Sequence, residues 1–333
     1  MDWNILGHES AIRYFKSQTK AGNTRHAYLI VGPDGVGRRT LALAFAKALN
    51  CRQAPQEGDF CDECLACRQI NEQRYADLTV LEVEEGSKDI KIDQVRDMQQ
   101  TLALSPYQSR FRMVLIPDFQ RATIGASNAL LKSLEEPPSK ALLILTADAK
   151  ESLLETIASR CEVIRLRPSP IEKLESFLKE EKGLEAKLAK KLAHLAAGKV
   201  GTALSYSQDP QSLDDYTEAL EDLNHLLKCR LRHRLQYIEK NQAKKGNQRE
   251  KFAFLIATWL SFWRDVMIRH EKADIPLVNL DQVDLIEETA GLMNSGQIEK
   301  ILKVHETSLG QLDANLNPRL VIENLLLELP VIG

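Results

Sequence analysis

The feature that most limits how this chain can fold is an alternation of short β-branched runs with helix-like segments over its first half. The predicted strands cover residues 27–31, 78–83, 112–117, 141–146 and 161–166. Helical patterns lie between them at 39–49, 92–104, 126–135 and 153–158. This order is typical of a parallel sheet with crossover helices, so one α/β domain is predicted over 1–166. Such sheets bind ligands at the carboxyl ends of their strands, where the loops after Val31 and Pro117 are expected.

The remainder of the chain is predicted to be helical, because strand-like runs stop near Pro168 and Pro170. A small helical domain is expected over 167–207, and a larger one over 208–333. The expected helices are 171–182, 184–197, 203–206, 213–240, 249–270, 280–293, 295–314 and 318–328. The glycines of 198–201 interrupt the pattern, and the polar stretch 207–212 is a predicted linker. A chain of 333 residues exceeds one ordinary core, which agrees with several domains.

Charge and hydropathy exclude two classes of protein. The 44 Lys and Arg residues balance 47 Asp and Glu residues, so the net charge is −3. This balance excludes a protein that coats nucleic acid through bulk positive charge, although it leaves room for a local basic face. The longest apolar runs, such as 142–145, are far too short to span a membrane. The first residues lack the pattern of a secretion signal, and a cytoplasmic protein with no membrane partner is expected.

A glycine-rich turn follows the first predicted strand and leads into a helix, which is the setting of a phosphate-binding loop. The candidate residues are Gly32, Gly35, Gly37, Arg38, Arg39 and Thr40. The required pattern is G-x-x-x-x-G-K-[ST], so Arg38 replaces the lysine and Arg39 replaces the hydroxyl that binds Mg²⁺. A guanidinium has no lone pair for a metal, and Thr40 lies one residue late, about 100° further around the helix. We expect a degenerate loop, compatible with weak anion binding, that does not support ATP hydrolysis; a turn that never bound a ligand is the less favoured alternative.

The end of the third predicted strand has a second defect. An ATPase of this kind needs two acidic residues there, one for Mg²⁺ and one for the attacking water. This chain offers Asp118 alone, directly after Pro117. A solvated strand-end residue is the favoured interpretation of Asp118, and both defects together predict an inactive ATP site.

Four of the six cysteines lie within one short segment, at Cys51, Cys61, Cys64 and Cys67. A disulfide framework would be spread more widely, and in a reducing compartment such a cluster indicates a metal site. Four thiolates at these spacings suit a structural, tetrahedral Zn²⁺, and an iron–sulfur cluster is chemically possible. Four reduced cysteines without metal are disfavoured in so polar a loop, because free cysteines prefer burial. Zinc is expected to fold the 51–67 insert, while the isolated Cys161 and Cys229 are expected to be packed.

Several motifs together resemble one known family. They are His26-Ala27-Tyr28-Leu29, the glycine loop, the four-cysteine insert, the 128–138 block (NALLKSLEEPP), Ser159-Arg160-Cys161 and Asn317-Pro318-Arg319-Leu320. In this order they resemble the bacterial DNA polymerase III clamp loader, an AAA+ assembly, and among its members the delta-prime subunits. The resemblance extends along the whole chain, and the 128–138 block with the Ser-Arg-Cys triplet is its most specific part.

The resemblance implies a three-part subunit with an AAA+ P-loop-like domain over 1–166, a helical lid over 167–207 and a collar over 208–333. The collar would join a hetero-pentameric ring with gamma/tau-type and delta-type subunits, which acts on the sliding clamp and primed DNA. The family's motor subunits keep Lys and Thr in the phosphate loop, an Asp-Glu pair after the third strand, and a lid arginine. Here Pro117 and Asp118 occupy the acidic positions, and Gly201 occupies the lid position.

These departures imply a subunit that is not an enzyme by itself. The resemblance places it in the DNA polymerase III holoenzyme, which is a DNA-directed DNA polymerase (nucleotidyltransferase) complex for DNA replication. The resemblance also implies a role for Arg160, as an arginine finger that acts in trans on ATP held by a neighbouring subunit. Without the resemblance, a solvated arginine would be the favoured interpretation of Arg160.

Two other functions remain open at the level of sequence. An active motor subunit would need the missing Lys, Thr and Asp-Glu groups. A zinc-dependent DNA-binding protein would need basic surface around the cysteines, where the loop is mildly acidic.

Arg96 is compatible with contact to DNA phosphates or with a surface salt bridge. The stretch 228–251 carries nine Lys or Arg residues against two Glu residues, and a solvated collar helix is favoured over contact with DNA.

Overall fold

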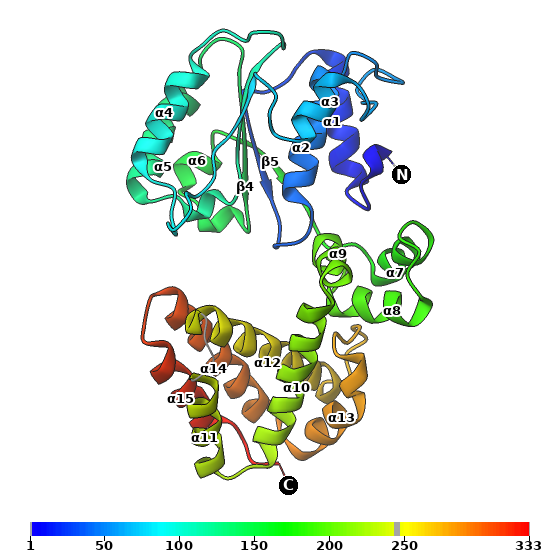
Figure 1. Cartoon of the computed structure of the whole chain (residues 1–333), viewed down its shortest axis with the longest axis vertical. Coiled ribbons are helices and arrows are strands. Elements are labelled where there is room, and N and C mark those ends of the chain that lie inside the picture. Colours follow the sequence, from blue (N-terminus) through cyan, green and yellow to red (C-terminus); the bar gives the residue numbers. More distant parts are fainter. Residues whose placement is uncertain (1, 243–246, 333) are drawn as a thin grey trace. The chain divides into compact units, whose positions relative to one another are not determined.

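The computed structural model of the chain describes residues 2–242 and 247–332. By its internal contacts the chain divides into two compact units (Figure 1). Unit 1 comprises Met1–Glu181 with Gly198–Thr202, and unit 2 comprises Lys182–Ala197 with Ala203–Gly333. The predicted lid, 167–207, is divided between the two units, so its boundaries as a separate domain stay a prediction. Within the described residues, no helix combines the length and the apolar character that a membrane span requires.

Unit 1 contains a five-stranded sheet with the order β2-β3-β4-β1-β5. The strands are β1 (Ala27–Val31), β2 (Leu78–Val80), β3 (Arg112–Ile116), β4 (Ala141–Ala147) and β5 (Glu162–Arg165). Every neighbouring pair is parallel, so the predicted α/β class and all five predicted strands are confirmed. The second strand is shorter than predicted: its pairing with β3 ends at Val80, and the Leu81 N–H donates to the Leu115 carbonyl oxygen at 2.9 Å. Since β1 lies between β4 and β5, the loop that follows it opens near the middle of the sheet.

Helices cover both faces of this sheet, which explains why β1 and β4 are buried along their whole length (Figure 1). The helices of unit 1 are α1 (Glu9–Ala21), α2 (Arg38–Asn50), α3 (Leu65–Asn71), α4 (Ile92–Leu102), α5 (Ile124–Glu135), α6 (Glu155–Ala158) and α7 (Ile171–Glu180). Helices α1 to α3 lie on one face, and α4 to α6 lie on the other. Along β1, Tyr28 and Ile30 join the first core, whereas Leu29 and Val31 join the second.

The structure corrects several predicted boundaries among the helices. Helices α1 and α3 were not predicted, and α4 to α7 agree with predicted segments within a few residues. The predicted linker 207–212 is wrong, since α9 (Val200–Gln208) is followed almost at once by α10 (Pro210–Lys228). Pro210 stands in the first turn of α10, where a proline begins a helix without losing a hydrogen bond. The predicted interruption near 198–201 is present slightly earlier in the chain: one helix ends at Leu195 and α9 begins at Val200, so Gly198 lies in the break and Gly201 in the first turn of α9.

Unit 2 is all-helical, as predicted. Its remaining helices are α8 (Ala186–Leu195), α11 (Leu231–Gln242), α12 (Gln248–His270), α13 (Val283–Leu292), α14 (Ser295–Asp313) and α15 (Pro318–Glu328). The predicted single helix 213–240 is broken at Cys229, where the backbone becomes extended. Trp259 and Trp263 of α12 are fully buried at the centre of the core.

The basic stretch 228–251 is not uniformly solvated. Its Arg234 is buried and donates hydrogen bonds to the carbonyl oxygens of Leu226, Leu326, Leu329 and Pro330, at 2.6–3.1 Å. This arginine therefore closes the ends of α10 and α15, where carbonyl groups lack helical partners. Lys244 and Lys245, which belong to the same predicted stretch, lie outside the described residues.

His305 of α14 makes the stability of unit 2 depend on pH. Burial lowers the pKa of His305 to about 4, although a hydrogen bond to the Ile301 carbonyl opposes the shift. The neutral imidazole is favoured in the folded state, so its stabilisation is complete above pH 6.5 and is lost as the pH falls toward 4. We expect urea unfolding, followed by tryptophan fluorescence, to show a loss of about 3 kcal/mol across this range. His305→Asn should flatten the dependence and the exposed control His233→Asn should not; an unchanged slope in His305→Asn would contradict the prediction.

Candidate functional site

The glycine-rich loop after β1 has the backbone shape of a phosphate-binding loop. Gly35 has φ of 75°, and Gly37, at the N-cap of α2, has φ of 105°, a left-handed region that favours glycine. A cavity of about 250 Å³ lies over this loop. It is lined by Asp34, Gly35, Gly37, Arg38, Arg39, Thr40, Pro117, Asp118, Thr146 and Gly201. The structure thus brings the predicted loop residues together with the end of β3 and the start of α9.

The Arg38 side chain folds back into its own loop. Its Nη1 donates to the Gly32 carbonyl oxygen at 2.6 Å, and its Nη2 donates to Asp118 Oδ1 at 2.6 Å. Only 7% of the side chain is exposed. Charge-assisted contacts on both nitrogens satisfy a cation that would otherwise be costly to bury. Asp118 is therefore more than a solvated strand-end residue, because it is the counter-ion of Arg38.

Arg39 lines this cavity, but its guanidinium is bound by residues that follow α3 and β2. Its guanidinium pairs with Glu82 Oε1 at 2.5 Å and donates to Gln73 Oε1 at 2.7 Å. Thr40 is exposed at the next position of α2. The place where a hydroxyl would bind Mg²⁺ is thus occupied by a cation that is tied to another part of the domain.

Gly201 lies directly against the phosphate loop. Its backbone N–H donates to the Gly35 carbonyl oxygen at 2.7 Å. A Cβ atom at position 201 would come within 2.8 Å of that same oxygen. A side chain such as arginine therefore cannot stand at position 201 unless the loop moves, which explains a glycine at this position.

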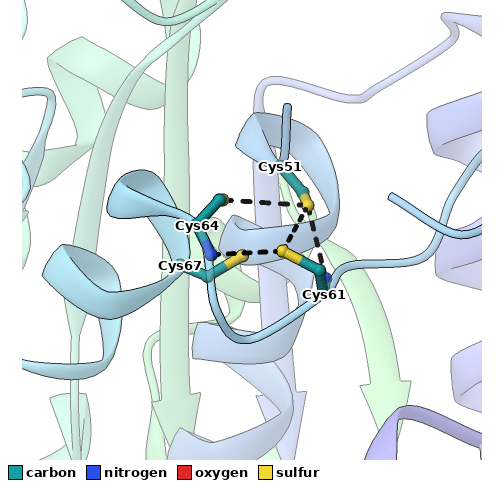
Figure 2. A group of neighbouring side chains, drawn as sticks. All are labelled: Cys51, Cys61, Cys64 and Cys67. Carbon is teal, nitrogen blue, oxygen red and sulfur yellow. Dashed lines mark hydrogen bonds between the residues drawn. The ribbon is translucent and has the colours of Figure 1, made fainter. Parts of the chain in front are cut away.

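The four predicted metal ligands meet in one cluster (Figure 2). Cys51 follows α2, Cys61 lies in the loop, Cys64 is the N-cap of α3 and Cys67 lies in its first turn. All four sulfur atoms lie within 4.8 Å of one another, and Cys51 Sγ is 3.6 Å from Cys61 Sγ and 4.0 Å from Cys64 Sγ. Zn–S bonds of about 2.3 Å place tetrahedral sulfurs about 3.8 Å apart, so the cluster fits one such ion.

The cluster already contains groups that stabilise thiolates. The backbone N–H of Cys61 donates to Cys51 Sγ, and that of Cys64 donates to Cys61 Sγ, both at 3.3 Å. Burial raises the pKa of Cys64, but hydrogen bonds with the Cys67 and Arg52 backbone outweigh it and lower the pKa to about 6. Burial raises the pKa of the Cys51 and Cys67 thiols. A bound divalent cation is the group that would let all the sulfurs carry negative charge together.

The insert that carries the cysteines is anchored to the N-terminal segment. Trp3 Nε1 donates to the Gly58 carbonyl oxygen and to Asp59 Oδ1, both at 3.2 Å. Lys16 of α1 pairs with Asp59 at 2.5 Å, and the Trp3 and Phe60 rings lie 5.7 Å apart. The insert is thus packed against unit 1 and is not a free loop.

Arg160 lies on the turn that leads into β5, whereas the phosphate loop follows the end of β1; because β1 and β5 are parallel, the two lie at opposite ends of these strands. Its Nη2 pairs with Glu135 Oε1 at 2.8 Å, and its Nη1 donates to the Thr156 carbonyl oxygen at 2.9 Å. No sequence motif gives Glu135 a role of its own, although Glu135 belongs to the 128–138 block. A partner at the end of another helix is not visible in local sequence patterns.

The remaining candidates are placed as follows. Cys161 packs against the core of unit 1, and burial raises the pKa of its thiol to about 12, in agreement with a packed cysteine. Cys229 instead lies partly exposed at the end of α10, with its Sγ 3.3 Å from His225 Nε2. Arg96 is exposed and lies 3.4 Å from Asp93 on the same helix, the surface pair that the sequence allowed.

Comparisons with known proteins find relatives over most of the chain. A family model described as "DNA polymerase III, delta subunit" matches residues 7–170. A second, described as "DNA polymerase III, delta subunit, C terminal", matches residues 210–330. Together they cover both the α/β unit and the helical unit.

Curated relatives include delta′, gamma and tau subunits of DNA polymerase III. The chain is 41% identical over 136 residues to DNA polymerase III subunit delta′ of Pseudomonas aeruginosa, a match that covers 41% of each protein. It is 32% identical over 189 residues to subunit delta′ of Escherichia coli, covering 57% of this chain and 56% of that protein. It is 31% identical over 207 residues to subunit gamma of Buchnera aphidicola, covering 61% of this chain and 56% of that protein. In these matches the chain spans 41–56% of the length of its relatives.

Among solved structures, a gamma-subunit-related protein from Thermotoga maritima aligns with 94% of this chain and 97% of its own. The TM-score of this alignment is 0.48, and the sequence identity is 23%.

Proposed function

This chain belongs to the DNA polymerase III delta-subunit family, and from that membership we propose that it is the non-hydrolysing, delta-prime-type subunit of a clamp loader. In this role it helps to load the sliding clamp onto primed DNA, in a hetero-pentamer with gamma/tau-type and delta-type subunits. The 208–333 region would supply the collar that joins the ring. Because relatives of both the delta′ and the gamma type resemble the chain, the phosphate loop is the feature that separates the two roles.

The observation that carries the proposal is the position of Arg38. Phosphoryl transfer depends almost entirely on positioning and on charge stabilisation by Mg²⁺ and the loop lysine. In this chain the cation of the loop is buried against Gly32 and Asp118, and so it is turned toward the protein. Asp118, the one carboxylate after β3, is engaged by the same cation. These contacts favour a subunit that is a structural and regulatory member of the assembly over an active motor.

We expect the purified chain to show no steady-state ATPase activity, with or without primed DNA. The physical reason is that three groups of an ATP site are missing or engaged. Arg39 stands where a hydroxyl would bind Mg²⁺, and Pro117 stands where a carboxylate is needed. The Asp118 carboxylate is paired with Arg38. The measurement is phosphate release in Mg²⁺-ATP after a final sizing column. Asp118→Ala is the control, because trace activity that is equal in both proteins comes from a contaminant. Turnover that co-elutes with the chain and disappears in Asp118→Ala would favour the motor role.

Arg160 is proposed to serve the ATP site of a neighbouring subunit. A permanently charged, planar guanidinium suits the charge that develops on a transferring phosphoryl group. The side chain is 37% exposed, and it stands on a turn at the edge of the domain, where another chain can approach it. Its place before the start of β5, at the opposite end of the strands from the phosphate loop, agrees with action in trans.

The cysteine cluster is proposed to hold one structural Zn²⁺ through Cys51, Cys61, Cys64 and Cys67. Four sulfur ligands leave no open position for a substrate, so the ion would fold the insert and take no part in a reaction. Asp62 beside the cysteines pairs with Lys47 of α2, and Lys47 lies 4.1 Å from the centre of the Phe60 ring. These contacts tie the insert to the domain and favour a structural role over contact with DNA.

The experiment that tests the proposed function is reconstitution. The purified full-length chain is mixed with gamma-type and delta-type subunits, and the mass of the complex is read by native mass spectrometry. We expect a hetero-pentamer that contains this chain and that loads a sliding clamp onto primed DNA. The proposal would be contradicted if the other subunits formed a complete pentamer without this chain and that pentamer loaded the clamp equally well.

A further inference from the structure

The exposed Arg160 side chain is held by two acceptors of its own chain. Its Nη2 lies 2.8 Å from Glu135 Oε1, and its Nη1 donates to the Thr156 carbonyl oxygen at 2.9 Å. Glu135 is the last residue of α5, and Thr156 belongs to α6. The guanidinium is therefore fixed between the ends of two helices, although its side chain is 37% exposed and that of Glu135 is 50% exposed.

Both ends of this contact rest on the same rigid core. Leu134 precedes Glu135, and Ile157 and Ala158 precede the Arg160 turn; all three are buried in the core on the α4–α6 face of the sheet. The Arg160 backbone N–H also donates to the Ile157 carbonyl oxygen at 3.1 Å. The backbone at both residues is thus joined to one buried core.

The contact leaves much of the guanidinium available. An arginine has five N–H donors, and within the described part of the chain Arg160 uses one on Nη1 and one on Nη2. The other donors, among them Nε–H, can therefore meet an incoming phosphate while Glu135 and Thr156 keep their contacts. An arginine that is already ordered loses less rotamer freedom when it meets its target.

We propose that Glu135 is a positioning residue that holds Arg160 in the rotamer in which it serves the ATP of a neighbouring subunit. This inference rests on the arginine-finger role proposed above and adds to it a residue that acts through the finger. An exposed ion pair contributes little to folding, so the effect should appear in the rate of hydrolysis and not in the stability of the chain. Because side-chain ordering is the quantity at stake, the loss should not exceed about tenfold at the affected site.

The test compares Glu135→Gln with Arg160→Ala and with the double variant in the reconstituted complex, in the presence of ATP, clamp and primed DNA. Glu136→Gln is the matched control, because it removes the same charge one residue later in the same block. We expect Glu135→Gln to lower kcat by less than Arg160→Ala does, with unchanged KM for ATP and unchanged assembly. In the Arg160→Ala background, Glu135→Gln should cause no further fall in kcat. Glu136→Gln should have the kcat of the wild type.

A second readout does not depend on catalysis. In the free chain, the Nε–H resonance of Arg160 should show restricted motion in the wild type and in Glu136→Gln, and greater motion in Glu135→Gln. Wild-type kcat in Glu135→Gln, together with a strong effect of Arg160→Ala, would overturn the inference and leave the finger role standing. The inference would also be overturned if Glu135→Gln lowered kcat by the same factor in the wild-type background and in the Arg160→Ala background. No effect of Arg160→Ala would instead refute the finger role itself.

Discussion

Replacing Arg160 with alanine is expected to leave assembly intact and to lower ATP hydrolysis at the neighbouring site by about 10³–10⁵-fold. A finger supplied in trans stabilises the charge of the transferring phosphoryl group, and alanine has no donor that could do so. The fall in total ATPase should be smaller than this factor, because other motor sites of the complex would hydrolyse in parallel. Assembly, DNA-stimulated ATPase and clamp loading are measured separately.

Two control variants sharpen this measurement. Arg167→Ala removes an exposed arginine shortly after β5 and should leave hydrolysis unchanged. Arg160→Lys retains the charge but loses the planar fork, so it should recover only part of the activity. Normal ATPase and normal loading in Arg160→Ala would show that Arg160 is an ordinary surface residue.

Replacing Cys64 with serine is expected to empty the cysteine cluster and unfold the insert around it. The wild-type chain should contain about one zinc ion, because four thiolates complete one tetrahedral site. Structural zinc in small peptides binds with apparent free energies of about 10–16 kcal/mol, so the loss of one ligand should have a large local effect. Elemental analysis measures the metal, and limited proteolysis measures cleavage within the 51–67 insert.

Cys229→Ser is the matched control, because it removes a thiol far from the cluster in the sequence and should retain the zinc. The sheet of unit 1 should survive in Cys64→Ser, since most of its core consists of residues outside the insert and α3. A visible absorption band and bound iron would identify an iron–sulfur cluster instead of zinc. The absence of any metal from protein purified without chelator would contradict a metal site.

Local patterns in the sequence were sufficient to predict the sheet and the type of each candidate site. The strands β1, β3 and β4 are short and mostly apolar runs, and burial on both faces requires that composition. The glycine loop and the four cysteines were likewise visible, because their chemistry depends on residues that lie close together in the chain. Helix ends were predicted less well, as the wrong linker at 207–212 shows, because polar residues occur both in linkers and in the first turn of a helix.

The tertiary structure alone decided what these residues contact. Arg38 meets Asp118 across 80 positions of sequence, because β1 and β3 both end at the same edge of the parallel sheet. Gly201 meets Gly35 because the start of α9 is packed on the phosphate loop. The Glu135–Arg160 pair exists because the ends of α5 and α6 rest on one core. A sequence pattern shows which types of side chain are present in a segment. The partners of a long, charged side chain depend on elements that come together only when the chain folds.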